Sequence, residues 1–208
     1  ETRGLAGVVP GTRVVQATCL VLDLPDTYDA YLGMLGKSLR YDVRKLDKSL
    51  FKEGRAKIRM ATAEDVHASL DVLFDLHRKR WKERHLPGAF LGKGMAFHHE
   101  WAEKAVREGW LRLGVLELDG APIGAIYAMA VGDTAYFYQA GFDPGQGAVS
   151  PGTLLVADAI RRAIEEGQRH FDFMRGDEGY KRRWKPQRAL HNLRFVLPAR
   201  GVLGRVGS

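Results

Sequence analysis

The sequence lacks several features that would point to particular classes of protein. Its 208 residues include one cysteine, Cys19, so the chain holds no internal disulfide and no Cys-x-x-Cys metal or redox pair. No apolar run reaches the roughly 18–20 residues that a membrane-spanning helix needs, and no signal-peptide pattern is visible. Internal repeats and low-complexity segments are also missing. We therefore expect a cytoplasmic protein that folds around an ordinary hydrophobic core.

Several catalytic signatures are missing as well. No Gly-x-Ser-x-Gly elbow supports a serine hydrolase, and no Gly-Lys-Ser/Thr sequence completes a phosphate-binding Walker loop. The pair His98-His99 suggests a metal, but no second histidine at helical spacing completes such a site. The sequence therefore predicts neither of these two enzyme classes, and we expect no metal.

Positive charge is the first clue to partners. The chain has 32 Lys and Arg residues against 25 Asp and Glu, a net charge of +7. Residues 37–59 carry nine basic side chains and three acidic ones, and a second basic cluster lies within residues 175–188. An excess of this kind favours an anionic partner such as nucleic acid, a phosphorylated cofactor or a membrane surface. A solvated helix face explains each cluster equally well.

The order of secondary structure predicts a mixed fold. Alternating and β-branched segments indicate strands, and apolar positions three to four residues apart indicate helices. Expected strands cover residues 14–24, 56–61, 110–118, 122–131, 134–142, 170–174 and 190–197. Expected helices begin at Asp26 and Thr62 and cover residues 39–51, 95–108, 153–166 and, as a short turn, 177–184. This order predicts an α+β (mixed α/β) domain.

A loop–helix junction at residues 146–155 is the first candidate site. It follows an expected strand and opens an expected helix, with the small residues Ser150, Gly152 and Thr153 at the turn. Backbone N–H groups at a helix N-terminus bind phosphate oxygens, and small side chains let a ligand approach. A plain strand–helix connection stiffened by Pro151 is the alternative.

A strand followed by a charged turn at residues 170–184 is the second candidate. The strand ends in Arg175-Gly176, turns through Asp177-Glu178, and presents Tyr180-Lys181. A phenol beside an ammonium group acts as a proton donor or holds an oxyanion. The alternative is a surface turn in which the acids neutralise nearby arginines.

These segments together resemble a known family. The three-strand meander, glycine-rich loop, helix, strand and aromatic–Lys turn are similar to the GCN5-related N-acetyltransferase (GNAT) fold, with a central, mostly antiparallel sheet flanked by helices. More narrowly, residues 171–181, Ser150-Pro151-Gly152 and residues 39–46 resemble the CelD/BcsL-type acetyltransferases. That group is related to the Fem-type peptidyltransferases, which carry a comparable aromatic–Lys pair. The resemblance covers roughly residues 20–197, and the usual GNAT pyrophosphate loop is altered here by Val149 and Pro151.

The resemblance implies an enzyme that transfers an acetyl or other acyl group from acyl-CoA to an amine, or less readily to a hydroxyl. It implies that Tyr180 is the general acid and Lys181 an electrostatic stabiliser, while Asp172 or Asp177 orients the acceptor or serves as base. The expected donor-binding residues are Gln139, Ala140 and Gly141 at the end of a strand, and Ser150, Gly152 and Thr153 at the junction.

Acceptor contacts are expected from four residues, namely Arg40, Arg44, Tyr138 and Arg175. Arg40 and Arg44 begin a row on the basic helix that continues through Lys48 and Lys52 at mostly i, i+4 spacing. The acceptor is a small molecule or a peptide or sugar amine.

Two other functions remain open, namely a Fem-like transferase that uses aminoacyl-tRNA and a non-catalytic binding module with the same fold. We expect residues 1–19 to form an N-terminal strand and tail, the remnant of a longer chain, and residues 20–208 to form the acyltransferase domain.

Overall fold

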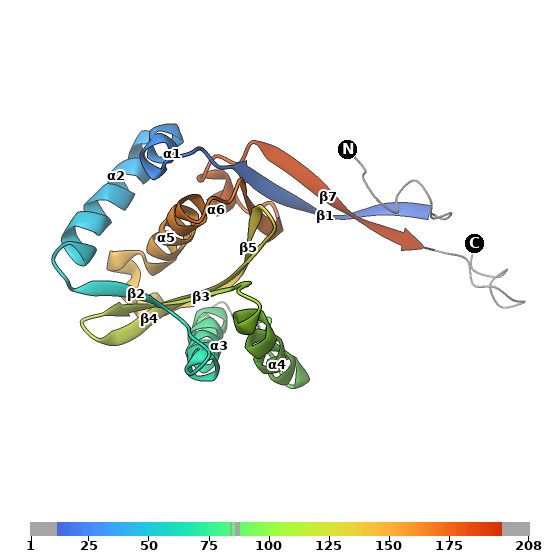
Figure 1. Ribbon diagram of the computed structural model, residues 1–208, viewed down its shortest axis with the longest axis horizontal. Coiled ribbons are helices and arrows are strands. Elements are labelled where there is room, and N and C mark those ends of the chain that lie inside the picture. The colour runs from blue at the N-terminus through green and yellow to red at the C-terminus, as the bar shows by residue number, and fades with distance from the viewer. Residues whose placement is uncertain (1–11, 84, 86–87, 197–208) are drawn as a thin grey trace, which may run out of the picture.

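One sheet runs through the whole protein. A computed structural model describes residues 12–83, 85 and 88–196 (Figure 1). The seven strands lie in the order β2-β3-β4-β5-β6-β1-β7, and only β5 and β6 are parallel neighbours. They are β1 (Thr12–Asp23), β2 (Ala56–Met60), β3 (Leu111–Leu118), β4 (Ala121–Val131), β5 (Thr134–Phe142), β6 (His170–Arg175) and β7 (Arg188–Val196). The predicted α+β class with a mostly antiparallel central sheet is confirmed.

Helices cover both faces of this sheet (Figure 1). α1 (Tyr28–Met34), α2 (Lys37–Leu46) and α5 (Pro151–Glu165) lie on one face, where Phe171 and Phe173 of β6 join their core. α3 (Val66–Glu83) and α4 (Lys93–Arg107) lie on the other face, over Ala125 and Tyr127 of β4. The remaining helix, α6 (Gly179–Arg182), follows β6. None of the described helices is both long enough and apolar enough to cross a membrane.

The basic helix has two parts. α2 buries Leu39 and Val43 as its 3.6-residue period requires, and the chain then continues as a π-helical turn, η2 (Asp47–Phe51). The Lys52 N–H donates to the Asp47 carbonyl at 3.1 Å, five residues back. Gly54 then ends the helix with φ of +72°. The expected helix over residues 39–51 is therefore present, with a wider last turn than its sequence pattern predicts.

The glycine-rich loop is more ordered than its composition suggests. Residues 144–149 form a 3₁₀ helix, η3 (Pro144–Val149), and the Asp143 carboxylate caps it by accepting a hydrogen bond from the Gly145 N–H at 2.9 Å. α5 starts at Pro151, two residues earlier than expected, because proline suits the first position of a helix. Ser150 makes the connection with φ of +45°. The junction is thus a fixed turn between two helices.

A gap between β5 and β6 is the feature that positions the site. Their pairing extends only from Thr134–His170 to Tyr136–Asp172, although β5 continues to Phe142 and β6 to Arg175. The register of β5 against β4 shifts between Tyr127 and Ala128, which leaves Tyr138 as an extra residue in β5. Such a bulge bends a strand and increases its twist. The carboxyl ends of the only parallel pair therefore diverge, and ligands bind at such ends.

Candidate functional site

Two cavities meet at the gap between β5 and β6. The larger one, about 640 Å³, lies toward α3 and is called the α3-side cavity here. The smaller one, about 340 Å³, lies toward α5 and is called the α5-side cavity. Both are lined by four residues in common, namely Arg80, Phe137, Ala140 and Tyr180. The arrangement is a passage through the sheet with Tyr180 at its meeting point.

Tyr180 stands where a proton donor is useful. Its side chain is 42% exposed, and α6 presents it to both cavities. Burial of the ring is the main cause that raises the pKa of Tyr180 to about 12, and the Glu178 carboxylate adds to this while Arg80 opposes it. The phenol therefore keeps its proton throughout the neutral range.

Lys181 is buried, and the turn after β6 uses its ammonium group. The residue is 3% exposed, and Nζ donates to the carbonyl oxygens of Arg175 at 2.6 Å and Gly176 at 3.2 Å. The third contact of Nζ is an ion pair with Glu178 Oε2 at 2.9 Å. An ammonium group has three donors, so these three contacts account for all of them. Lys181 thereby holds the segment that carries Tyr180.

The backbone of this turn explains why Asp172 and Gly176 are present. Met174 adopts φ of +55°, and its N–H donates to Asp172 Oδ1 at 2.6 Å. Gly176 has φ of +109°, and a Cβ there would lie 2.3 Å from Glu178 Oε1. Burial raises the pKa of Asp172, which caps the strand end and lines neither of the two cavities.

Of the two adjacent acids in the turn, the structure directs Glu178 into the α3-side cavity. Asp177, which the sequence suggested as a residue that orients the acceptor or serves as base, lines neither cavity and pairs with Arg182. Sequence reasoning missed Glu178 as a site residue. The available signal was its position two residues before Tyr180 on a turn that Gly176 bends.

Arg80 is the second residue that sequence reasoning missed. It comes from the last part of α3, its Nη1 donates to the Ala140 carbonyl at 3.3 Å, and its guanidinium lies 4.4 Å from the centre of the Phe142 ring. The stacked contact is a cation–π interaction, which holds the cation in place beside the gap. A basic residue at the end of a long amphipathic helix gives no sequence signal of this role.

The α5-side cavity contains the N-terminus of α5. Gly147, Ser150, Pro151, Gly152 and Thr153 line it together with Arg183. The N–H groups of Thr153 and Leu154 both donate to the Ser150 carbonyl, and Pro151 has no N–H to offer. The helix end is thus positive and built from small residues, but it has fewer free donors than an ordinary phosphate-binding turn.

Five more of the predicted site residues lie on or next to β5 and β6. Tyr138, Gln139, Ala140 and Arg175 line the α3-side cavity. Gly141 instead faces α3, where a Cβ would lie 2.4 Å from the His77 backbone nitrogen.

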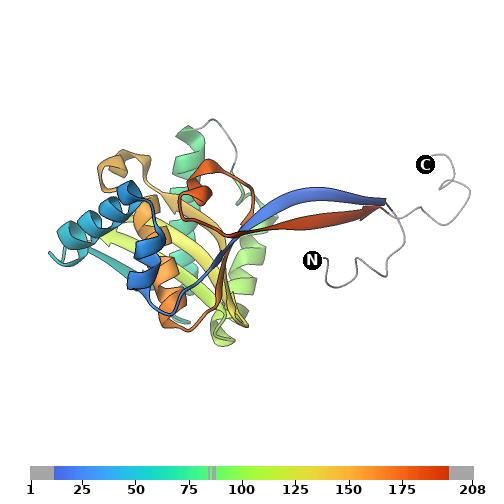
Figure 2. The same cartoon turned by 90° about the horizontal axis from the view of Figure 1, so that it is seen from above.

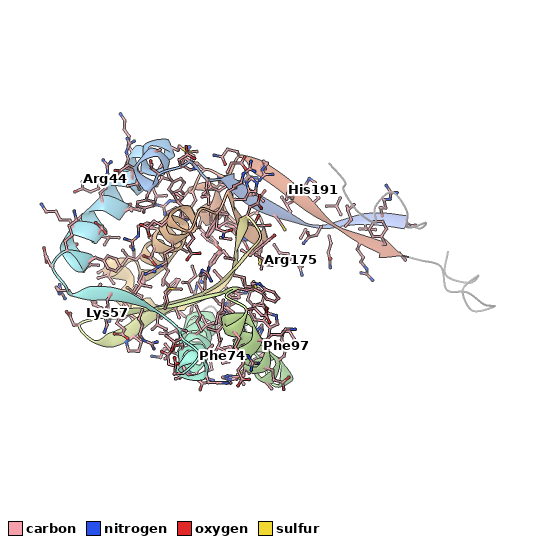
Figure 3. The ribbon with its side chains drawn as sticks, in the orientation of Figure 1. Arg44, Lys57, Phe74, Phe97, Arg175 and His191 are labelled. Carbon is pink, nitrogen blue, oxygen red and sulfur yellow. The ribbon has the colours of Figure 1, made fainter. Side chains whose placement is uncertain are left out.

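The basic helix supplies neither cavity with an arginine. Arg40 Nη1 donates to the Gly33 carbonyl at 3.2 Å, within the same layer of helices. Arg44 lines a separate cavity of about 440 Å³ between α2 and α5, and it lies away from Arg175 (Figure 3). The structure therefore does not bring Arg40 and Arg44 together with Tyr180.

Metal ligands are not clustered in the described part of the chain, where no three His, Cys, Asp or Glu side chains are arranged to hold an ion. The ring nitrogens Nδ1 of His67 on α3 and His99 on α4 lie 2.8 Å apart. The His67 ring also contacts the carboxylate of Glu103, and the His99 ring that of Asp71. These contacts join the two helices on the outer surface.

Two solved structures with the same fold are longer than this chain. The structure of FemX superposes with a TM-score of 0.64 at 10% identity, covering 80% of this chain and 55% of FemX. The C-terminal domain of a protein described as a lysylphosphatidylglycerol synthetase from Agrobacterium fabrum gives 0.62 at 13% identity, covering 88% and 60%. This chain therefore spans less than two thirds of the length of either.

A third structure is shorter and is covered almost completely. An aminoglycoside acetyltransferase from an uncultured soil metagenomic sample, in complex with sisomicin, gives a TM-score of 0.51 at 15% identity, covering 71% of this chain and 99% of the other. No curated protein matches the sequence. Residues 37–182, which include the gap, Tyr180 and all of the lining of both cavities except Arg183 and Trp184, match the acetyltransferase (GNAT) domain family. The chain belongs to the GNAT acetyltransferase domain family.

Proposed function

We propose that this protein transfers an acyl group from acyl-CoA to an amine, with the donor on the α5 side of the gap and the acceptor on the α3 side. The observation that carries this proposal is the passage between β5 and β6, because both cavities open onto Tyr180 and Arg80. The CelD/BcsL-type assignment rests on the motif residues around Tyr180. Acetyl-CoA is the donor that the family suggests.

The residues of the α5-side cavity fit a long thioester with phosphate groups. Small residues at Gly147 and Gly152 leave room, while the α5 N-terminus and the guanidinium groups of Arg80 and Arg183 provide positive charge. When bound, acyl-CoA supplies an acyl carbon that is activated as a thioester. The Ala140 segment of β5 offers backbone groups beside the gap.

Tyr180 and Glu178 divide the proton transfers between them. The Tyr180 hydroxyl keeps its proton at neutral pH and donates it to the leaving group at the meeting point of the cavities. The Glu178 carboxylate faces the α3-side cavity, where it attracts an ammonium group and accepts a proton from it. Lys181 acts by positioning both residues through the turn.

An acceptor panel tests the proposal. We expect acetyl-CoA to bind, to raise the melting temperature, and to release free thiol when amino sugars or lysyl peptides are supplied. We expect Glu178→Gln to raise KM for the amine and to leave KM for acetyl-CoA unchanged, with Asp177→Asn as the matched control. Absence of both binding and thermal protection at saturating acetyl-CoA would contradict the proposal.

One observation favours a second candidate, a transferase that uses aminoacyl-tRNA as donor. Pro151 and the bonded N–H groups of Thr153 and Leu154 leave few donors for a diphosphate, and Arg44, Lys48 and Lys52 form an exposed basic row. Contacts with RNA phosphates would make donor affinity fall steeply with salt. Transfer from aminoacyl-tRNA, with no thiol release from acetyl-CoA, would select this function.

A further inference from the structure

A two-stranded ribbon extends from the body of the protein. Over residues 12–18, β1 pairs with β7, whereas its described pairing with β6 covers only Val21–Asp23 and an isolated bridge at Cys19. Figures 1 and 2 show this ribbon projecting well beyond the helices. His191, labelled in Figure 3, lies on it. An isolated two-stranded ribbon is only marginally stable in water, so this one needs a surface to cover it.

Both faces of the ribbon carry exposed apolar side chains among polar ones. The register places Val14 and Leu190 on one face, and Val15, Leu193 and Phe195 on the other. Val15 is 60% exposed and Val14 is 47% exposed, whereas most aliphatic side chains of the body are buried, with Leu91 and Val131 as exceptions. A flat protein surface would cover one face of such a ribbon and leave the other in water. An environment that surrounds the ribbon suits it better.

The described ribbon carries positive charge and no negative charge. Residues 12–18 and 190–196 contain two arginines, Arg13 and Arg194, and no acidic residue. Arg13 and Arg194 are the ribbon arginines farthest from the body, and the Arg13 guanidinium lies 6.0 Å from the centre of the Phe195 ring. The described ribbon thus contributes +2 to the net charge of +7, with no acidic side chain to oppose it.

We propose that the β1–β7 ribbon docks this protein on a bilayer that contains anionic phospholipids. Valine and phenylalanine side chains enter the boundary between headgroups and acyl chains, and Arg13 and Arg194 reach the lipid phosphates. A second copy of the chain would instead place arginines against arginines. Nucleic acid would offer phosphates but no partner for apolar side chains on two faces.

The backbone limits how deep the ribbon can lie. β7 is the edge strand of the sheet, so its outer N–H and C=O groups have no strand partner among residues 12–83 and 88–196. Hydrocarbon does not satisfy such groups, whereas lipid headgroups and interfacial water do. The ribbon therefore lies in the headgroup region, within roughly 5–10 Å of the acyl boundary, and does not cross the membrane.

Vesicle sedimentation tests this proposal on the purified full chain. We expect strong binding to vesicles of phosphatidylglycerol and phosphatidylcholine in equal parts, and at least about tenfold weaker binding to phosphatidylcholine alone. Arg13→Glu with Arg194→Glu should weaken binding to the mixed vesicles by about tenfold or more. Val15→Glu with Phe195→Glu should do the same. Lys37→Glu with Lys45→Glu, an equal charge change on α2, should leave binding unchanged.

Four results would overturn the proposal. One is mixed-vesicle binding that the ribbon variants do not weaken, and another is equal binding to both vesicle types. The third is a dimer in solution that Val15→Glu with Phe195→Glu dissociates, and the fourth is binding of an RNA oligonucleotide by a protein that ignores vesicles. The three double variants change positions that are exposed or, at Phe195, partly exposed, so an unchanged far-UV spectrum and melting temperature confirm that the comparison concerns folded protein.

Discussion

The two cavities on either side of the β5–β6 gap differ in what makes them polar. The α3-side cavity has ionisable side chains, Arg175 and Glu178, beside the aromatic rings of Trp81 and Tyr138. The α5-side cavity contains the N-terminus of α5 and the guanidinium groups of Arg80 and Arg183 but no acidic side chain, and apolar residues such as Leu39 and Val156 form much of its wall. Substitution readily replaces side-chain groups, whereas the backbone N–H groups at a helix N-terminus remain as long as the fold is kept. The difference favours acceptor specificity on the α3 side and a constant donor on the α5 side.

A substitution at the contact between β5 and α3 should have the largest effect on stability. Gly141 contacts α3 so closely that a Cβ would lie 2.4 Å from the His77 nitrogen and 2.9 Å from the Leu73 carbonyl oxygen. We expect Gly141→Val to lower the free energy of unfolding by about 4 kcal/mol or more, measured by urea denaturation, because helix and strand must separate. Gly147→Ala on the α5 side is the control, since nothing lies within 4 Å of its Cβ. Equal losses in both variants would contradict the expectation.

Removing the hydroxyl group of Tyr180, which lines both cavities, should lower the turnover rate and leave folding intact. We expect Tyr180→Phe to lower kcat by about 10²–10³-fold, because a positioned acid contributes roughly that much. KM for each substrate should change less than about threefold. The pKa of Tyr180 is about 12, so the wild-type rate should not fall through loss of this proton between pH 7 and pH 10.

The outcome that would remove Tyr180 from the mechanism is an unchanged kcat in the folded Tyr180→Phe variant. Tyr41→Phe is the matched control, because Tyr41 is 65% exposed on α2 and lines neither cavity. A rate loss in both variants would point to a general effect on folding.

His77, which is buried on α3, should make the stability of the protein depend on pH. Burial, with the charge of Arg80 as a smaller cause, lowers the pKa of His77 to about 4 from its usual 6.5. A base whose folded pKa is depressed stabilises the protein above its unfolded pKa, and this contribution is lost as pH falls from 6.5 toward 4. We expect a loss of about 2 kcal/mol over that interval, measured by urea denaturation at several pH values.

His77→Phe should flatten this pH dependence, whatever its effect on absolute stability. His191→Phe on the exposed ribbon should leave the slope as in the wild type. An identical slope in the wild type and in His77→Phe would show that other groups cause the acid sensitivity.

Local patterns predicted the sheet well. β5 has the expected bounds, because alternation over residues 134–142 is a local property of the sequence. The motif at residues 171–181 likewise located the turn that carries Tyr180, since Gly176 and Asp172 mark its backbone geometry. Features set by neighbouring residues were therefore within reach of sequence reasoning.

Long-range contacts were not predicted. Arg80 and Ala140 lie 60 positions apart, and nothing near Arg80 in the sequence indicates the contact. The choice between Asp177 and Glu178 depends on the φ of +109° at Gly176, which directs one acid inward and the other outward. The basic row was visible in the sequence, but its distance from Tyr180 depends on how α2 packs over α5.

Two arginines, one in each cavity, test the difference between the cavities through the smallest expected effect. Arg175 lines only the α3-side cavity, and Arg183 lines only the α5-side cavity. Each variant to glutamine removes one exposed charge, and the ion pair of Arg183 with Asp42, at 3.9 Å between exposed side chains, contributes little to stability. We expect Arg175→Gln to raise KM for the acceptor by about 3–10-fold, and Arg183→Gln to raise KM for the donor by a similar factor. Initial rates with one substrate varied at a time measure both. If either variant changes the KM of the other substrate instead, the assignment of donor and acceptor to the two sides is reversed.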